Sequence, residues 1–185
     1  LRDEALLTVC SQWGLVPLSL VTNAAYEAVT SGAPNSWTAS DSTLAQQTGT
    51  FPTTLWRRSM LVTNSGANGR ATSTSIYSLQ PAVIFYLFVP VSVRSGTAAV
   101  IVRDITAGAD ITLTGTSTST RRGWTGIEVT GTIPAGCDEI QVWLRGNGAT
   151  AIVEWGPVFF HEQGARVMQL DTRVLSTEDG GRLYQ

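Results

Sequence analysis

Lysine is absent from the 185-residue sequence, histidine occurs once and cysteine twice. All twelve positive side chains are therefore arginines, and only 14 % of the residues are charged, against about a quarter in typical globular proteins. The net charge of −2 and the pI near 5.3 give no sign of the basic face that nucleic-acid-binding proteins present. We therefore expect no nucleic-acid partner.

Long apolar runs and clustered cysteines are also missing. The run VIFYLFVPV (83–91) is much shorter than the ~20 residues of a membrane-spanning helix and contains a proline, so no membrane insertion is expected. Cys10 and Cys137 are far apart and match neither a redox pair nor a zinc site. Two buried free thiols are the favoured interpretation, with a disulfide between them as the alternative.

Threonine, serine and glycine take the place of the missing charged residues, and they favour strands and turns. A chain of 185 residues is long enough for one main domain with short appendages, because it buries roughly 70 % of its unfolded surface. Short alternating apolar runs follow Asn35 and predict β-strands. The runs are SMLVT (59–63), AVIFYLFVPVSV (82–93), AAVIVRDI (98–105), DITLTGTST (110–118), WTGIEVTGTI (124–133), EIQVWLRG (139–146) and TAIVEWGPVFF (150–160).

Turn-forming residues separate these runs. Asn147-Gly148 is the strongest turn signal, because a two-residue hairpin of type I′ requires positive φ at both positions. Seven or more strands without an internal repeat or a strand–helix alternation predict an antiparallel β-sandwich over residues 34–160. The other turns are expected at SGANG (65–69), RSG (94–96), TAGAD (106–110) and PAG (134–136).

The two ends of the chain differ from the predicted sandwich. Residues 1–33 are interpreted as a short helical arm, with a helix ended by Gly14 and a further helical turn as a candidate at AAYEAV (24–29). The tail, residues 161–185, is charged and irregular. An amphipathic arm rests its apolar face on its own domain or on a partner, so both ends are candidate assembly segments. The expected helical face consists of Leu6, Val9, Cys10 and Trp13.

The segment RRGWTGIEVTGTIPAG (121–136) resembles a strand and turn of the jelly-roll carbohydrate-binding modules that occur beside glycoside hydrolases and in bacteriophage tail fibres and spikes. Asn35-Ser36-Trp37, SMLVT, the apolar run over 78–93 and the hairpin over 139–160 are similar to other parts of these modules. The resemblance implies an all-β, galactose-binding-like jelly roll. It implies the fold more than the ligand, because the shared residues are mostly turn and core positions.

Acidic residues gather near the predicted hairpin ends, where the calcium sites of such modules often lie. Calcium takes six to eight oxygen ligands, and the sequence has no EF-hand spacing. Glu154 stands where family members usually have an aspartate, which weakens the analogy. We expect solvated turn charges and no cofactor, with structural calcium as the alternative. The acidic residues concerned are Asp104, Asp110, Asp138 and Glu139.

Catalytic signatures are scarce. His161 is the only histidine, and the sequence contains no GxSxG nucleophile motif. Glycoside hydrolysis requires two carboxylates roughly 5–10 Å apart. Glu128 and Glu154 lie on predicted strands, but Glu128 alternates with apolar neighbours as an ordinary outward residue. We therefore assign no catalytic residue and expect a protein that is not an enzyme.

Sugar recognition depends on an exposed flat aromatic ring with polar neighbours. In EIQVWLRG (139–146), alternation turns the apolar residues toward the core and Gln141, Trp143 and Arg145 to the opposite face. Such a face fits a carbohydrate platform, a subunit interface or a ring covered by a loop of its own chain. The candidate carbohydrate-binding residues are Trp143, Gln141 and Arg145, with Trp37 and Trp56 as weaker, loop-proximal candidates.

The run from Val83 to Val89 is apolar on both faces, whereas a strand with one solvated face alternates with polar residues. Its second face is therefore expected to be covered, either by the N-terminal arm or by a neighbouring subunit. This feature favours association into a homo-oligomer.

Two interpretations from different classes fit these features. In the first, the chain is a non-catalytic structural protein of a virion, such as a spike, fibre or decoration component of a phage or phage-like particle. It would join its own copies and other virion proteins through the two arms, and contact host surface polysaccharide through the sandwich. In the second, it is a carbohydrate-binding module of a secreted polysaccharide-degrading enzyme. Neither terminus shows the Pro/Thr/Ser-rich linker usual for such a module, so the first interpretation is favoured.

Overall fold

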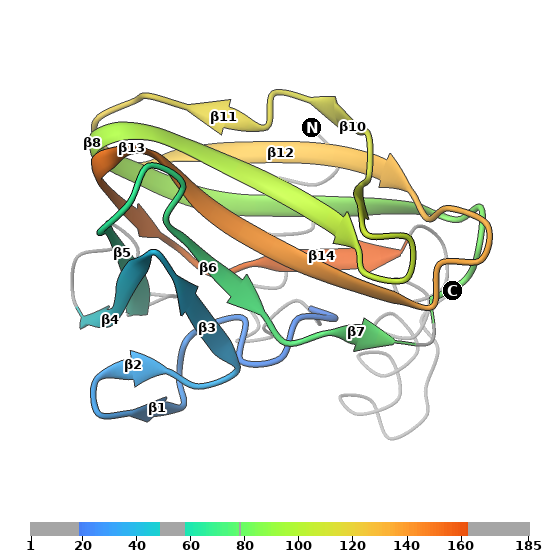
Figure 1. The fold of residues 1–185 in the computed structure, drawn as a ribbon, viewed down its shortest axis with the longest axis horizontal. Helices are drawn as coiled ribbons and strands as arrows, with labels where there is room; N and C mark the ends of the chain where they lie inside the picture. Colours follow the sequence, from blue (N-terminus) through green and yellow to red (C-terminus); the bar gives the residue numbers. More distant parts are fainter. Residues whose placement is uncertain (1–18, 49–57, 78, 163–185) are drawn as a thin grey trace, which may run out of the picture.

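A computed structural model describes residues 19–48, 58–77 and 79–162 (Figure 1). This part of the chain is all β, and every pairing between its strands is antiparallel, as the alternating pattern predicts. The predicted N-terminal helix, residues 163–185 of the predicted tail and Trp56 lie outside the described residues. His161 and Glu162, predicted to begin the irregular tail, belong instead to a strand. Within the described ranges, no helix is long and apolar enough to cross a membrane.

Two long strands form the frame of the fold. β8 (Ile84–Asp104) and β13 (Glu139–Trp155) pair along most of their length. Both bend at the same end of the molecule and so contribute to two layers (Figure 1). The bend falls at Gly96 of β8, opposite residues 148–151 of β13, where the register of the pairing shifts.

This continuity corrects two turn predictions. RSG (94–96) and Asn147-Gly148 were expected to reverse the chain, but each lies within one continuous strand. Gly96 has a φ of 79° and Gly148 a φ of 113°, whereas Asn147 is not among the residues with positive φ. A type I′ turn requires positive φ at both central residues, so the chain bends here and continues. The positive φ of Gly96 redirects β8 without ending its pairing.

The first layer is built around the initial half of β8. β12 and β14 pair with this half from opposite sides, and the final half of β13 continues the layer to β5 and β4. The strands concerned are β4 (Ser42–Thr48), β5 (Arg58–Asn64), β12 (Thr125–Thr132) and β14 (Phe159–Glu162), with β10 (Leu113–Gly115) at the edge beyond β12.

The second layer is built around the other halves of the same two strands. β6 and β7 pair with β13, β3 pairs with β6, and β9 and β11 pair with β8. The predicted strand over 110–118 is therefore split into short pieces with different partners. The strands of this layer are β3 (Trp37–Ser40), β6 (Arg70–Ser73), β7 (Ile76–Tyr77), β9 (Ala109–Asp110) and β11 (Thr118–Ser119).

The segment before β3 is a turn and a small hairpin rather than the candidate helical turn at 24–29. Asn23 and Tyr26 have positive φ, which interrupts a right-handed helix, and β1 (Val29–Thr30) pairs with β2 (Ala33–Pro34). The Asn23 amide donates to the carbonyl of Ala28 at 2.8 Å and ties the turn to the hairpin.

The core lies between the layers and is aromatic at its centre. Phe85 of β8 and Phe160 of β14 stack with their ring centroids 5.0 Å apart, and both side chains are fully buried. Leu87, Val89 and Trp155 are also fully buried. Each such side chain contributes roughly 1.5–3 kcal/mol by leaving water, so these residues of β8, β13 and β14 stabilise the sandwich.

The outer face of β8 is continued by β14. Tyr86 stacks on His161 at 5.4 Å, and Phe88 stacks on Phe159 at 5.9 Å, while Ile84 is 41 % exposed. The outward rings of Tyr86 and Phe88, on the face that was predicted to be covered, therefore stack on rings of the adjacent strand β14.

Candidate functional site

The first half of β13 carries the predicted alternation. Its apolar residues Ile140 and Val142 are fully buried, whereas Gln141, Trp143 and Arg145 are half-buried on the outer face of the second layer. β6 and β8 flank this half of β13, so side chains from three neighbouring strands share the face. We call the residues around Trp143 on this face the Trp143 face.

The indole ring of Trp143 is held between arginines of the flanking strands. The guanidinium carbon of Arg70 lies 4.2 Å from the ring centroid, and that of Arg103 lies 5.0 Å from it. Each cation–π contact contributes about 0.5–1 kcal/mol at an exposed site. The open platform suggested by the sequence is therefore partly occupied by guanidinium groups.

Hydrogen bonds fix the polar groups beside the ring. The indole N–H of Trp143 donates to Oε1 of Gln141 at 3.2 Å, and Nε2 of Gln141 donates to the Ser75 hydroxyl at 3.1 Å. Arg103 pairs with Asp110 at 2.8 Å. The face thus combines a flat ring, an oriented amide and several guanidinium donors.

Arg70 and Arg103 are functional candidates that the sequence interpretation missed. Arg70 follows a turn and Arg103 ends an apolar run, so neither has a local signal of its own. The alternation along β6 and β8 indicates that both arginine side chains point outward. Their approach to Trp143, however, depends on the pairing of three strands. In the observed register, Thr72 and Ile101 lie opposite Trp143, and each arginine reaches the ring diagonally.

Trp37 is a core residue and not part of this face. Its side chain is 7 % exposed, and its ring meets Tyr26 edge-to-face with centroids 5.7 Å apart. Its N–H donates to the Asn23 carbonyl at 3.3 Å. The position of Trp37 near a loop suggested an exposed ring, but segments that are distant in the chain bury it.

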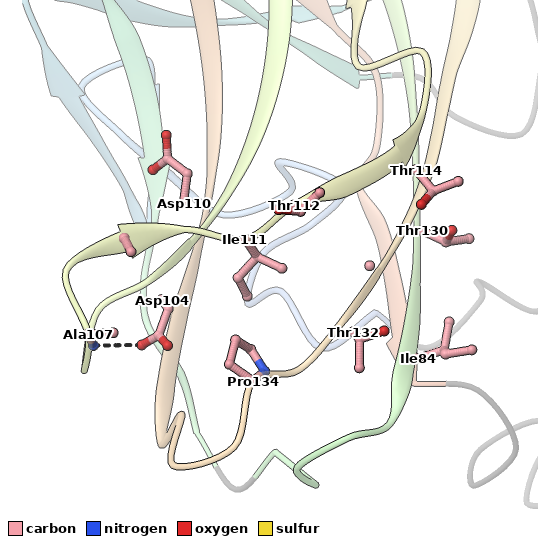
Figure 2. A pocket seen from close by; sticks show the side chains of 12 residues that line it. Ile84, Asp104, Ala107, Asp110, Ile111, Thr112, Thr114, Thr130, Thr132 and Pro134 are labelled. Carbon is pink, nitrogen blue, oxygen red and sulfur yellow. Dashed lines mark hydrogen bonds between the residues drawn. The ribbon is translucent and has the colours of Figure 1, made fainter.

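A groove of about 630 Å³ opens at the end of the sandwich opposite the bend (Figure 2). Threonines line one side, including Thr130 and Thr132, and Asp104 and Asp110 lie across from them. Its apolar lining is aliphatic, and none of the lining residues is aromatic. The groove can offer hydroxyl contacts, but it lacks a ring on which a pyranose could stack.

The acidic residues near this groove have other partners. Asp104 accepts a hydrogen bond from the Ala107 backbone N–H at 2.9 Å, Asp110 pairs with Arg103, and Glu139 accepts a hydrogen bond from the Ser75 hydroxyl. In the part of the chain that the structure describes, no three His, Cys, Asp or Glu side chains gather as a metal site would require. Each of these three carboxylates is thus engaged by a donor of the protein itself.

Cys137 lies beside this end of the sandwich as a buried free thiol. Burial raises the pKa of its thiol to about 11, and the neighbouring Asp104 carboxylate adds to the rise. A thiol with so high a pKa is a poor nucleophile at neutral pH.

The two carboxylates considered for glycoside hydrolysis do not converge. Glu128 lies opposite Phe88 on one side of β8, and Glu154 lies opposite Ser92 on the other side. Strand rise and spacing place their backbones roughly 16 Å apart, beyond the range of about 5–10 Å for a hydrolytic pair. Glu154 is also buried and accepts hydrogen bonds from Ser59 at 2.6 Å and Arg94 at 2.7 Å.

Comparison with known proteins extends these observations. No protein-family model matches the sequence, and no curated protein matches it. The CBM22-1 xylan-binding domain of Xyn10C from Paenibacillus barcinonensis has a TM-score of 0.61 at 13 % identity, covering 81 % of this chain and 97 % of that domain. TmCBM61, solved with β-1,4-galactotriose, has a TM-score of 0.57 at 11 % identity, covering 79 % and 99 %.

A phage protein has the same architecture. The enzymatically active domain of tailspike protein 4 from bacteriophage CBA120 has a TM-score of 0.56 at 12 % identity, covering 82 % of this chain. This chain spans about a quarter of that protein, with 23 % of its length covered. At such identities the likeness establishes the fold, and it confirms the jelly roll of carbohydrate-binding modules that the sequence motifs predict.

Proposed function

We propose that this β-sandwich binds polysaccharide, without cleaving it, through the Trp143 face. The observation that carries the proposal is the joint presence of the indole ring, the oriented Gln141 amide and guanidinium donors on one outward surface. Flat rings contact the C–H faces of sugars, and amide and guanidinium groups bind the hydroxyls. The groove of Figure 2 lacks the aromatic component, so we favour the Trp143 face.

The proposal of a non-catalytic role is supported by the placement of the carboxylates. Glu154 is engaged by Ser59 and Arg94, and Glu128 lies far along the sheet from it. His161 packs against Tyr86. Glu128 and Glu154 therefore lack the arrangement that hydrolysis of a glycosidic bond uses.

The proposed context is a virion, in which the sandwich is a spike, fibre or decoration component that contacts polysaccharide on the host surface. The likeness to a phage tailspike domain supports this context. Copies of the chain and other virion proteins are the proposed partners, held through the segments at the two ends. The alternative context is a module of a secreted polysaccharide-degrading enzyme, which the near-complete coverage of the CBM22-1 domain, 97 %, favours.

A glycan array with the wild type beside Trp143→Ala tests the binding site. We expect the wild type to bind at least one polysaccharide, and the variant to bind it roughly tenfold or more weakly, as for other central aromatic residues of binding sites. Tyr86→Ala is the matched control, because it removes a half-buried aromatic side chain from the other layer. Equal binding by wild type and Trp143→Ala, or no glycan binding by the wild type, would refute the proposal.

The mass of the protein in solution separates the two contexts. A trimer or larger assembly in light scattering supports the virion component. A monomer at the same concentrations supports the enzyme module.

A further inference from the structure

Three arginines from three strands gather on the Trp143 face. Arg70 comes from β6, Arg103 from β8 and Arg145 from β13. Arg145 lies directly opposite Arg70 in the register of the two strands, and Arg70 covers the ring of Trp143. Arg103 is paired with Asp110, so the positive charge that this face offers comes from Arg70 and Arg145.

The pairing of Arg70 with Arg145 is unfavourable in the free protein. Like charges directly opposite each other on adjacent strands repel and destabilise the sheet. The Nε atoms of both side chains are buried and have no hydrogen-bond partner. Among the described residues, Arg58, Arg94 and Arg103 have carboxylate partners, whereas no ion pair is formed by Arg70 or Arg145.

An anion bound between the two guanidinium groups would offset the repulsion between them. Guanidinium groups bind carboxylate and sulfate through paired, charge-assisted hydrogen bonds, and Trp143 holds Arg70 in place for such a contact. Neutral hydroxyl groups would satisfy donors but would leave the repulsion in place. Because the proposed function is glycan binding, the ligand is sought among acidic glycans.

We propose, building on the proposed glycan-binding function, that Arg70 and Arg145 select an acidic polysaccharide by binding its carboxylate or sulfate groups. The specificity of the site then comes from charge, and the indole ring supports the arginine pair. The acidic group is the shared chemistry, whether it belongs to a uronic acid or to a sulfate ester.

Matched pairs of polysaccharides test this specificity. The probes are polygalacturonate with its fully methyl-esterified form, and dextran sulfate with dextran, each pair immobilised at equal density within a general glycan array. We expect the wild type to prefer the acidic member of at least one pair tenfold or more, with the preference falling as salt rises. A preference in the first pair identifies carboxylate and one in the second identifies sulfate.

Variants assign the preference to the two arginines. Arg70→Gln/Arg145→Gln should bind both members of the pair equally. Arg121→Gln/Arg122→Gln removes the same charge from an exposed turn and should retain the tenfold preference. Arg145→Gln alone relieves the repulsion, so its melting temperature without ligand should not fall below that of the wild type.

The outcomes separate the inference from the function on which it rests. Equal binding of both members by the wild type, retention of the preference in the double variant, or a clear fall in the melting temperature of Arg145→Gln would overturn the acidic specificity alone. Binding of neither charged nor neutral glycans anywhere on the array would overturn the proposed function as well. Arginine-dependent binding of a DNA oligonucleotide without binding of acidic glycans would replace the glycan by a nucleic acid.

Discussion

Replacing Asn64 with alanine tests the corner at which β13 passes from one layer to the other. The Asn64 side chain is 8 % exposed, and its Nδ2 donates to the carbonyl of Gly146 at 2.7 Å and to that of Gly148 at 2.9 Å. These carbonyls lie at the register shift of β13. The two hydrogen bonds thus hold the bend that connects the Trp143 face to the rest of the sandwich.

The size of the effect follows from the surroundings of each carbonyl. Gly146 is buried, so losing its donor costs about 1–3 kcal/mol, whereas Gly148 is exposed and water replaces the donor at a cost of about 0.5–1.5 kcal/mol. We expect Asn64→Ala to lower the free energy of unfolding by about 2–4 kcal/mol. In a domain of this size, that corresponds to a melting temperature roughly 5–15 °C lower.

Urea unfolding followed by tryptophan fluorescence measures this loss. Asn68→Ala is the matched control, because Asn68 is exposed in the adjacent loop, and its loss should stay within about 0.5 kcal/mol. Equal losses in the two variants, or a loss below about 1 kcal/mol in Asn64→Ala, would refute the role given to these two hydrogen bonds.

Asn64→Asp sharpens the test through its pH dependence. A carboxylate at this position would face two carbonyl oxygens and could donate to neither, which raises its pKa in the folded state above the usual value of about 3.9. The variant should therefore lose stability, relative to Asn64→Ala, as the pH rises from about 4 through the raised pKa. A stability difference that does not depend on pH between pH 3 and 7 would contradict the proposed geometry.

Two further predictions concern buried polar groups. Tyr26→Phe removes a hydroxyl that donates to the Gly156 carbonyl at 2.9 Å, and it should lower the free energy of unfolding by about 1–2 kcal/mol in urea. Tyr77→Phe, at a side chain that is 63 % exposed, is the control, and an equal loss there would contradict the assignment. Burial raises the pKa of the Cys137 thiol to about 11 from its ordinary value of 9.0, so the folded state retains the thiol proton more strongly than the unfolded chain does. Its contribution to stability is complete below about pH 9 and is lost as the pH rises toward 11, and Cys137→Ala should flatten this part of the profile. Parallel alkaline profiles of the wild type and Cys137→Ala in urea titrations would exclude this role for the thiol.

The placement of outward and inward residues was predictable wherever one strand alternates regularly. In β12 the pattern turns Ile127 and Val129 to the core and Glu128 to solvent, as observed. In β13 it turns Trp143 outward between two buried neighbours. Successive side chains of any extended strand point to opposite faces, so this information is local.

The ends of strands were not predictable in the same way. Gly96 and Gly148 read as turn residues, because positive φ is what a tight reversal requires. A bend within a paired strand requires the same conformation. The choice between reversal and bend is made by the partner strands, which continue β8 and β13 past the corner.

The sequence by itself determined that this protein is a β-sandwich of the jelly-roll kind and that one tryptophan of a central strand faces outward, because side-chain alternation and turn chemistry act between near neighbours. Only the tertiary structure decided that Trp37 is buried against Tyr26 and that Arg70 and Arg103 meet Trp143. These contacts join residues far apart in the chain, and their geometry comes from the register of several paired strands. The charge character of the Trp143 face is therefore a property of the assembled sheet, which no single strand carries.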